Sequence, residues 1–429
     1  MTLPACASVA VVDTTEDEKA IGYPDSRKIV RDSQGNLYAA YRKKYRMFKV
    51  PTYHIFVARS SNGGSTWTVL NANIPVETTG DYNQRVPSIA IDGNDTIHVA
   101  WYGDDESSSD TNERQIKYVR SSDGGATWSP WRNLADVAGY RDGELWQEHP
   151  LIYAASDGIL YVVWEGQDRE HQGGAQTKFI KSIDAGSEWT PWINVSPSNR
   201  TNYSRPTVIS SKDGSALYIL AYSAVENVQQ IVWTQSNDGG LTWSPWQQVA
   251  PDSNDQRHLS LVIDSEDQLH VVWRQRLAGS PVASTQIHYS MYDGRVWSKV
   301  ALIGPSVSHY QFFPTIAITG ANQLWVAWSE TTSASGFPKE QPSGGDIYSV
   351  FNDGSGWSSR IQLTNNGQAL YPTLRREVYG NSNRIDILWL ENGRGPNNKI
   401  FYQTFLAEMA IASISNSDLA KQNQTVNER

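Results

Sequence analysis

One unit recurs along the whole chain, and this repeat constrains the fold more than any other feature. Each copy has a β-prone run, a polar turn and a second apolar run that ends in an aromatic residue. The seven closing aromatics are 51 to 63 residues apart: Tyr41, Trp101, Trp164, Tyr222, Trp273, Trp328 and Trp389. Units of this length that cannot bury their own faces must stack on one another, as in repeat proteins.

A third β-prone run and a tight turn follow most of the second runs. The clearest turns are Ser121 to Trp128 and Ser236 to Trp243, both with the pattern S-x-D-x-G-x-x-W. Two related turns are Ser60 to Trp67, with Asn62 in place of aspartate, and Ser182 to Trp189. Four short strands per unit are typical of a propeller blade. The sequence therefore predicts an all-β protein, a single β-propeller of seven four-stranded blades, with six blades as the alternative.

The two ends of the chain suggest how such a ring closes. The seventh unit has a third run, Lys399 to Phe405, but no clear fourth, and the β-prone run Ala7 to Val12 belongs to no unit. We expect an N-terminal strand, about residues 5–13, to complete the last blade, because closure removes exposed sheet edges. The predicted propeller covers residues 1–406, and the polar residues 407–429 form a C-terminal tail.

The S-x-D-x-G-x-x-W turns resemble the Asp-box, or bacterial neuraminidase repeat, of the sialidase-like propellers. In that family the boxes lie on the face away from the active site, so Asp123, Asp184 and Asp238 are expected to stabilise their own turns. Catalytic sialidase domains typically have six blades. A count of seven instead resembles the lectins and polysaccharide lyases built on related propellers.

Composition excludes several classes of function. The formal net charge is −9 and no basic stripe occurs, which argues against a nucleic-acid partner. No apolar run is long enough to span a membrane, and the single cysteine, Cys6, allows no intrachain disulfide. No cluster has metal-ligand spacing, so neither a metal nor another cofactor is expected. The first twelve residues show no signal peptide, yet the family resemblance suggests an extracellular or cell-surface protein.

Propeller ligands usually sit over a central funnel, formed by the starts of first strands and the ends of second strands. We predict that Arg85, Arg205 and Arg257 bind substrate there with His149 and His258, because all five lie at starts of first strands. The planar guanidinium forms paired hydrogen bonds with a carboxylate, a group that sialic and uronic acids both carry. Arg85-Val86-Pro87 also resembles the motif of the first carboxylate-binding arginine of sialidases.

The same resemblance suggests catalytic residues. Tyr371-Pro372-Thr373-Leu374 is similar to the stretch that carries the sialidase nucleophile, which implies that Tyr371 attacks the sugar. A tyrosine needs a nearby carboxylate to draw off its proton, since its free pKa is about 10, and Glu148 is the candidate. The acid/base aspartate of the family would follow the second strand of the second blade, where Asp104 and Asp105 occur.

Four hypotheses for function follow from these residues. The first is a glycan-binding propeller without turnover, which recognises acidic glycans. The second is an exo-acting glycoside hydrolase of the sialidase type. The third is a polysaccharide lyase in which His149 or Tyr371 abstracts a proton beside a uronate carboxylate neutralised by arginine. The fourth is a protein-binding scaffold. The sequence identifies neither the sugar, the linkage nor the oligomeric state.

Overall fold

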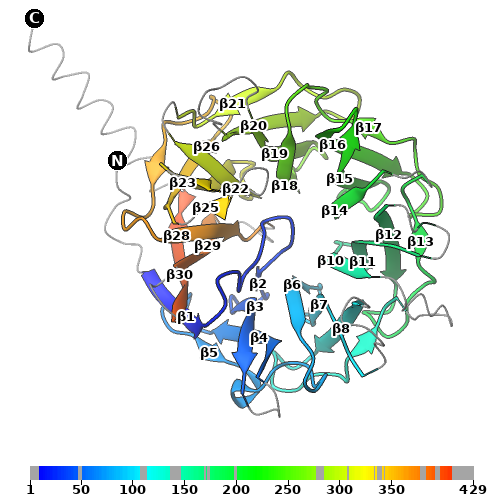
Figure 1. Ribbon diagram of the computed structural model, residues 1–429, viewed down its shortest axis with the longest axis vertical. Helices are drawn as coiled ribbons and strands as arrows, with labels where there is room; N and C mark the ends of the chain where they lie inside the picture. Colours follow the sequence, from blue (N-terminus) through cyan, green and yellow to red (C-terminus); the bar gives the residue numbers. More distant parts are fainter. Residues whose placement is uncertain are drawn as a thin grey trace, which may run out of the picture.

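Seven antiparallel four-stranded sheets are arranged in a ring in the computed structural model (Figure 1). The structure describes residues 9–46, 51–106, 114–135, 146–168, 171, 174–197, 201–276, 285–306, 309–332, 334–335, 341–342, 344–376, 383–391 and 397–407. The prediction of a seven-bladed all-β propeller is confirmed, and the six-bladed alternative is wrong.

The first six blades each use four strands in chain order, from the centre of the ring outwards. Blades one to three are β2 (Ile29–Arg31), β3 (Leu37–Tyr45), β4 (Thr52–Ser60) and β5 (Thr68–Val69); β6 (Gln84–Ile91), β7 (Ile97–Gly103), β8 (Gln115–Ser121) and β9 (Arg132–Asn133); and β10 (Gln147–Ala154), β11 (Leu160–Gly166), β12 (Gln176–Ser182) and β13 (Ile193–Asn194). Blades four to six are β14 (Tyr203–Ser210), β15 (Leu217–Val225), β16 (Val228–Ser236) and β17 (Gln247–Gln248); β18 (Gln256–Ile263), β19 (Leu269–Arg276), β20 (Thr285–Tyr292) and β21 (Ala301–Ile303); and β22 (Tyr310–Ile318), β23 (Leu324–Thr331), β26 (Asp346–Asn352) and β27 (Ile361–Gln362). A 3-10 turn (Asn71–Asn73) and a small hairpin of β24 (Ala334–Ser335) and β25 (Gln341–Pro342) lie between these strands.

The seventh blade joins the two ends of the chain. Its inner strands are β28 (Ala369–Leu374), β29 (Arg384–Glu391) and β30 (Asn398–Leu406), and its outermost strand is β1 (Val9–Thr15). β1 pairs antiparallel with β30, with Val11 opposite Phe401. The predicted closure by an N-terminal strand is therefore confirmed.

The second strands of the blades are buried on both faces, as stacking requires. Every residue of β7 and β11 is buried, including the closing aromatics Trp101 and Trp164, which are fully buried. One closing residue was predicted wrongly. Leu217 pairs with Ser236 as Ile97 pairs with Ser121, so Ala221 takes the position of Trp101, and Tyr222 faces the other side of its sheet. The cause is the two-residue period of a strand, in which a one-residue offset reverses the side chain.

The glycine-rich turns join third and fourth strands and are held by their own aspartates. Asp123 accepts hydrogen bonds from the Thr127 amide at 2.9 Å and from the Ser121 hydroxyl at 2.8 Å. Asp238 repeats this arrangement. Hydrogen bonds from Thr127 are the main cause that lowers the pKa of Asp123 to about 2. Because third-to-fourth turns lie at the ends of the inner strands, these carboxylates are on the face opposite the funnel.

Candidate functional site

A bulge near the start of six inner strands turns side chains towards the channel. In β6, β10, β14, β18, β22 and β28 the pairing shifts by one register at the same place. The bulged residues all have φ between 43° and 55°: Val86, His149, Arg205, His258, Phe313 and Tyr371. Positive φ is costly for these residues, and bulges often re-aim side chains beside functional sites. Four of the predicted residues, His149, Arg205, His258 and Tyr371, share this conformation and therefore occur at one level of the ring.

The segment of residues 16–28, here called the inserted segment, runs from β1 into the middle of the ring before β2 begins (Figure 1). Its Tyr23 ring lies 3.9 Å from the Arg205 guanidinium and is stacked on His258 with ring centroids 5.7 Å apart. The rings of Phe313 and Tyr371 also contact the Tyr23 ring, with centroid distances of 5.8 and 6.1 Å. Sequence reasoning missed Tyr23, because the inserted segment is not part of the repeat.

The phenol of Tyr23 is more acidic than usual. Burial alone would raise its pKa, but the charges of Arg205 and Lys19, which also hydrogen-bond to it, outweigh burial and lower the pKa. The ring remains partly exposed. Tyr23 therefore has the position and the acidity of a group that could exchange a proton with a ligand in the funnel.

Arg205 lies at the centre of this site. Its Nη1 is 3.6 Å from Asp25 Oδ2. Burial would lower the pKa of Arg205, but Tyr222, Asp25, Tyr23 and Glu165 raise it. The guanidinium is thus charged at all pH values of interest, and it lies within electrostatic reach of both Tyr23 and Glu165.

His149 and Glu165 form a dyad beside Arg205. His149 Nδ1 lies 2.5 Å from Glu165 Oε1, and its ring is 5.3 Å from the ring of Tyr102. Burial would raise the pKa of Glu165, but His149 and Arg205 lower it, so the carboxylate is ionised. An ionised partner at Nδ1 fixes the imidazole tautomer with its proton there. Within the described parts of the chain no hydrogen bond engages Nε2, which leaves this nitrogen available as a base.

Arg85 and Glu148 lie on the same side of the funnel but have different surroundings. Glu148, the predicted partner of Tyr371, forms an ion pair with Arg114. Arg85 is opposite Tyr102 in the strand register, and its Nε makes no hydrogen bond to any described residue. Tyr102 lies near the positive charges of Arg85, Arg114 and Arg205, although burial raises its pKa. The charges of three arginines therefore act on Tyr102 in this wall of the funnel.

Of the other predicted residues, Tyr371 and His258 are buried, whereas Arg257 is partly exposed. Tyr371 is only 4% exposed, and burial raises its pKa well above 10. His258 is sandwiched between Tyr23 and Phe313, and burial, then the charges of Arg274, Arg205 and Arg257, lower its pKa. Arg257 donates two hydrogen bonds to Asp255, at 2.7 and 3.0 Å. The structure therefore brings Arg205 and His258 together around Tyr23, and His149 lies against Glu165, whose charge acts on Arg205, while Arg257 pairs with Asp255.

The two aspartates after β7 have opposite environments. Asp105 is 1% exposed and forms an ion pair with Lys117, whose ammonium group lies 4.6 Å from the Trp131 ring. Asp104 Oδ1 is buried without a hydrogen-bond partner among the described residues. Burial raises the pKa of Asp104, although Arg114 and Arg85 oppose the shift. Asp104 is thus the better candidate for an acid.

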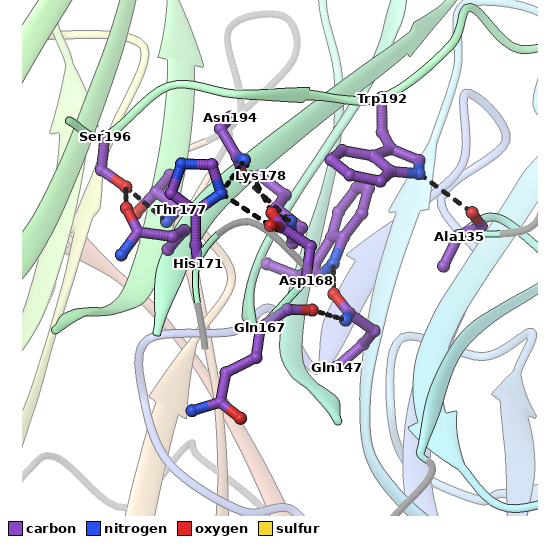
Figure 2. Close-up of polar contacts among 12 residues, drawn as sticks. Ala135, Gln147, Gln167, Asp168, His171, Thr177, Lys178, Trp192, Asn194 and Ser196 are labelled. Atoms are coloured by element: carbon purple, nitrogen blue, oxygen red, sulfur yellow. Dashed lines mark hydrogen bonds and ion pairs between the residues drawn. The ribbon is translucent and has the colours of Figure 1, made fainter. Parts of the chain in front are cut away.

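The ion pair of Asp105 is repeated in the next blade, as Figure 2 shows. Lys178 Nζ lies 2.6 Å from Asp168 Oδ2 and 2.9 Å from Asn194 Oδ1, and 4.0 Å from the Trp192 ring. His171 Nδ1 adds a contact of 2.6 Å to the other Asp168 oxygen. An ion pair that recurs at equivalent positions of two blades indicates a structural role. Asp105 therefore joins the loop after β7 to its blade.

Among the residues that the structure describes, neither a metal-binding group nor a membrane-spanning helix occurs. The described residues contain no group of three or more histidine, cysteine, aspartate or glutamate side chains that could hold a metal ion. Among the same residues, no helix is long and apolar enough to cross a membrane.

Comparisons with known proteins agree with the fold. No protein-family model matches the chain. A xyloglucanase of Hypocrea jecorina is 26% identical over 46% of this chain, and the match spans a quarter (25%) of that enzyme's length. Among solved structures, the polysaccharide lyase Uly1 has a TM-score of 0.57 at 11% identity, covering 91% of this chain and 92% of its own. A Penicillium chrysogenum α-L-arabinanase complexed with arabinobiose has a TM-score of 0.50 at 14% identity, with 75% and 93% covered. The chain shares its propeller fold with proteins named for their action on carbohydrates.

Proposed function

We propose that this protein is a carbohydrate-active propeller that cleaves an acidic polysaccharide by β-elimination in its funnel. The observation that carries the proposal is the position of Arg205 between the acidic phenol of Tyr23 and the His149–Glu165 dyad. These groups supply the three elements that elimination beside a carboxylate needs: a cation, a base and an acid.

The reaction follows from these roles. Arg205, with Arg85, binds the uronate carboxylate and stabilises the charge that develops when the neighbouring carbon loses its proton. His149 Nε2 takes that proton, and Glu165 stabilises the imidazolium that results. The electron pair of the C–H bond forms a carbon–carbon double bond, and the bond to the glycosidic oxygen breaks. Tyr23 donates its proton to that oxygen, and its lowered pKa makes it a better acid for this step.

The comparisons support action on carbohydrates and do not bear on whether the substrate is acidic. Uly1 is named a polysaccharide lyase, and the other two proteins reported above are named a xyloglucanase and an α-L-arabinanase complexed with arabinobiose. The glycine-rich turns add the resemblance to the Asp-box of sialidase-like propellers. An acidic substrate is favoured by Arg85, Arg114 and Arg205 in the funnel. A protein of this kind would act outside the cell, where polysaccharides occur.

Hydrolysis is a second candidate, favoured by Asp104. Its raised pKa and unpaired oxygen suit a general acid that protonates a glycosidic oxygen. The sialidase-type mechanism with Tyr371 as nucleophile has less support, because that phenol is buried and its pKa is raised. Glu148, its predicted partner, pairs with Arg114.

The test is product analysis on a panel of uronate polysaccharides and sialosides. Elimination produces a conjugated double bond, seen by ultraviolet absorbance, with one new reducing end per cleavage, whereas hydrolysis produces only the reducing end. We expect unsaturated product from the wild type. His149→Ala should lower the rate about 100-fold or more, the usual contribution of a general base. Tyr371→Phe is the matched control and should retain most activity.

The pH profile tests the role of Tyr23. Because the phenol must be protonated to act as an acid, the rate should fall as pH rises through its lowered pKa. Tyr23→Phe should reduce the rate and remove this fall. If the products contain no double bond, the reaction is hydrolysis and the elimination proposal is wrong. If the protein binds glycans without forming any product, and Arg205→Met abolishes that binding, the protein is a lectin.

A further inference from the structure

Tyr222 is a tyrosine beside Arg205 that the proposed reaction does not use. In its sheet it is paired with the residue directly before the bulge, which is the position of Tyr102 in blade two and of Glu165 in blade three. Both of those side chains contact His149. Tyr222 therefore belongs to the same level of the funnel, in the next blade of the ring.

Arg205 is next to Tyr222 across the strand pair of blade four. β14 and β15 are paired at Ser204 and Tyr222, and Arg205 is the bulged residue that follows Ser204. The charges of Arg205 and Arg257 act on the phenol of Tyr222, and those of two carboxylates oppose them. The side chain of Arg205 is 17% exposed, so the phenol and an accessible guanidinium share one part of the funnel.

The hydroxyl of Tyr222 forms no hydrogen bond within the part of the chain that the structure describes, yet it is not sealed off from solvent. Tyr222 is 8% exposed, whereas the hydroxyls of Thr207 and Ser329 are buried and unpaired. Burial of the ring, which outweighs the charge of Arg205, raises the pKa of the phenol well above its usual value, so the hydroxyl keeps its proton. The pKa of Tyr23 is lowered instead. Environments that move two pKa values apart give the two groups different roles.

We propose that Tyr222 is a substrate-binding residue that selects an acidic sugar, because its hydroxyl donates a hydrogen bond to the uronate carboxylate that Arg205 holds. Hydrogen bonds to an ionised acceptor are stronger than those between neutral groups. A neutral sugar carries a hydroxymethyl group in place of the carboxylate, so it gains neither this bond nor the attraction of the guanidinium. The inference rests on the function proposed for the funnel and names a determinant of its substrate class.

The same bond should also matter for the rate. When the carbon beside the carboxylate loses its proton, negative charge develops on the carboxylate oxygens, and a donor already aimed at them stabilises that charge. Tyr222 would therefore contribute to both binding and turnover, whereas the proton that reaches the glycosidic oxygen still comes from Tyr23.

Binding of small sugars tests the proposal without any turnover. The probes are the methyl glycosides of glucuronate and galacturonate, each compared by NMR titration with the neutral sugar of the same configuration. We expect the wild type to bind a uronide more tightly than its neutral counterpart, and Arg205→Met to abolish this preference. Tyr222→Phe should weaken uronide binding at least about tenfold, as the loss of a hydrogen bond to a charged group implies, and leave the neutral sugar unaffected.

Tyr161→Phe is the matched control. It removes a hydroxyl from a 1% exposed tyrosine at the opposite end of the neighbouring second strand, β11, far from the funnel. This variant should bind both kinds of sugar as the wild type does, and melting temperatures show that all the variants fold. On a polysaccharide that the protein cleaves, Tyr222→Phe should lower kcat/KM but keep the fall in rate at high pH that Tyr23 causes.

The outcomes separate this proposal from the proposed reaction. If Arg205→Met loses the preference for uronides and Tyr222→Phe keeps it, Tyr222 is not a determinant and the inference is overturned, while elimination is unaffected. If Tyr222→Phe loses the preference but no substrate gives an unsaturated product, the inference holds and elimination is wrong. A wild type that does not prefer uronides would overturn both this inference and the acidic substrate.

Discussion

Lys28 is the residue whose environment most clearly links the channel to stability. Its side chain is 1% exposed and contacts the Ser26 hydroxyl at 2.5 Å and the Pro87 carbonyl oxygen of the next blade. Burial, together with the charge of Arg376, lowers its pKa to about 7, although Asp25 opposes the shift. A lysine in the unfolded chain has a pKa of about 10.4, so the folded protein binds this proton more weakly.

The lowered pKa of Lys28 makes the free energy of unfolding depend on pH. Between pH 7 and about 10.4 the unfolded chain binds a proton at Lys28 that the folded protein lacks, so stability rises with pH, by at most about 1.4 kcal/mol per pH unit. Urea denaturation between pH 7 and pH 9 measures this slope. Lys28→Met should flatten it, whereas Lys299→Met, an exposed control, should leave it intact. Equal slopes in all three proteins would show that Lys28 is not the cause.

At the scale of residues, the sequence predicts where a side chain lies in the ring better than it predicts which residue it pairs with. The repeat register placed His149, Arg205 and His258 at one level, and the structure shows the bulge that they share. The register could not show that Arg257 would pair with Asp255, because that depends on how one flexible side chain turns. Tyr23 was missed for another reason: no other blade contains a copy of the inserted segment.

At the scale of elements, the glycine-rich turns join neighbouring blades as well as neighbouring strands. Gly63 and Gly64 are adjacent in one turn, with φ of 70° and 91°. A Cβ atom at Gly64 would lie 1.7 Å from Tyr402 Cε1, in the seventh blade, whereas a Cβ atom at Gly63 would meet nothing within 4 Å. The second glycine is therefore required by packing between blades, and the first by backbone conformation alone.

Alanine at the two glycines separates these requirements. Gly63→Ala should cost about 1 kcal/mol, the order of the strain of one residue with positive φ. Gly64→Ala adds a clash with a buried ring and should cost several kcal/mol in total, within the range of overpacked cores. Urea denaturation of both variants gives the difference. Similar losses would mean that Tyr402 moves aside freely and that the contact does not constrain the blades.

The elements themselves were predictable because their signals are local. Apolar β-prone runs and glycine-rich turns identified the strands of each blade. The error at Tyr222 shows the limit of this reasoning. An aromatic ended the run Leu217 to Tyr222, but only the pairing of Leu217 with Ser236 shows that Ala221 is the equivalent residue. Tyr222 instead lies within reach of the charges of Arg205 and Asp25.

At the scale of the whole molecule, the N-terminal part of the chain has two structural roles. β1 completes the seventh blade, and the inserted segment that follows brings Tyr23 into the funnel and Pro24 to Arg376. The number of blades and the closure were predictable from counting units and finding one strand left over. The insertion was not, because it depends on how a short polar segment fits a channel that exists only after the ring has formed.

Two adjacent residues of β1 test how much closure contributes. Val12 is 5% exposed and packs in a core with residues of the first and seventh blades, whereas Val11 is 43% exposed. Val12→Asp would bury an unpaired carboxylate, so we expect a loss of more than about 3 kcal/mol. Val11→Asp changes the same residue type to the same charge on the solvent side and should stay within about 0.5 kcal/mol of the wild type.

Light scattering on heating should separate the two variants further. If β1 leaves β30 in Val12→Asp, the exposed strand edge can pair with other molecules, and aggregation should begin at a lower temperature than in Val11→Asp. Loss of the strand should also release the inserted segment, so Tyr23 would leave Arg205, and any catalysis in the funnel should fall before the ring unfolds. Retained stability in Val12→Asp would show that stacking between blades holds the ring without this strand, and the position of Tyr23 would then depend on Arg205 and Arg376 alone.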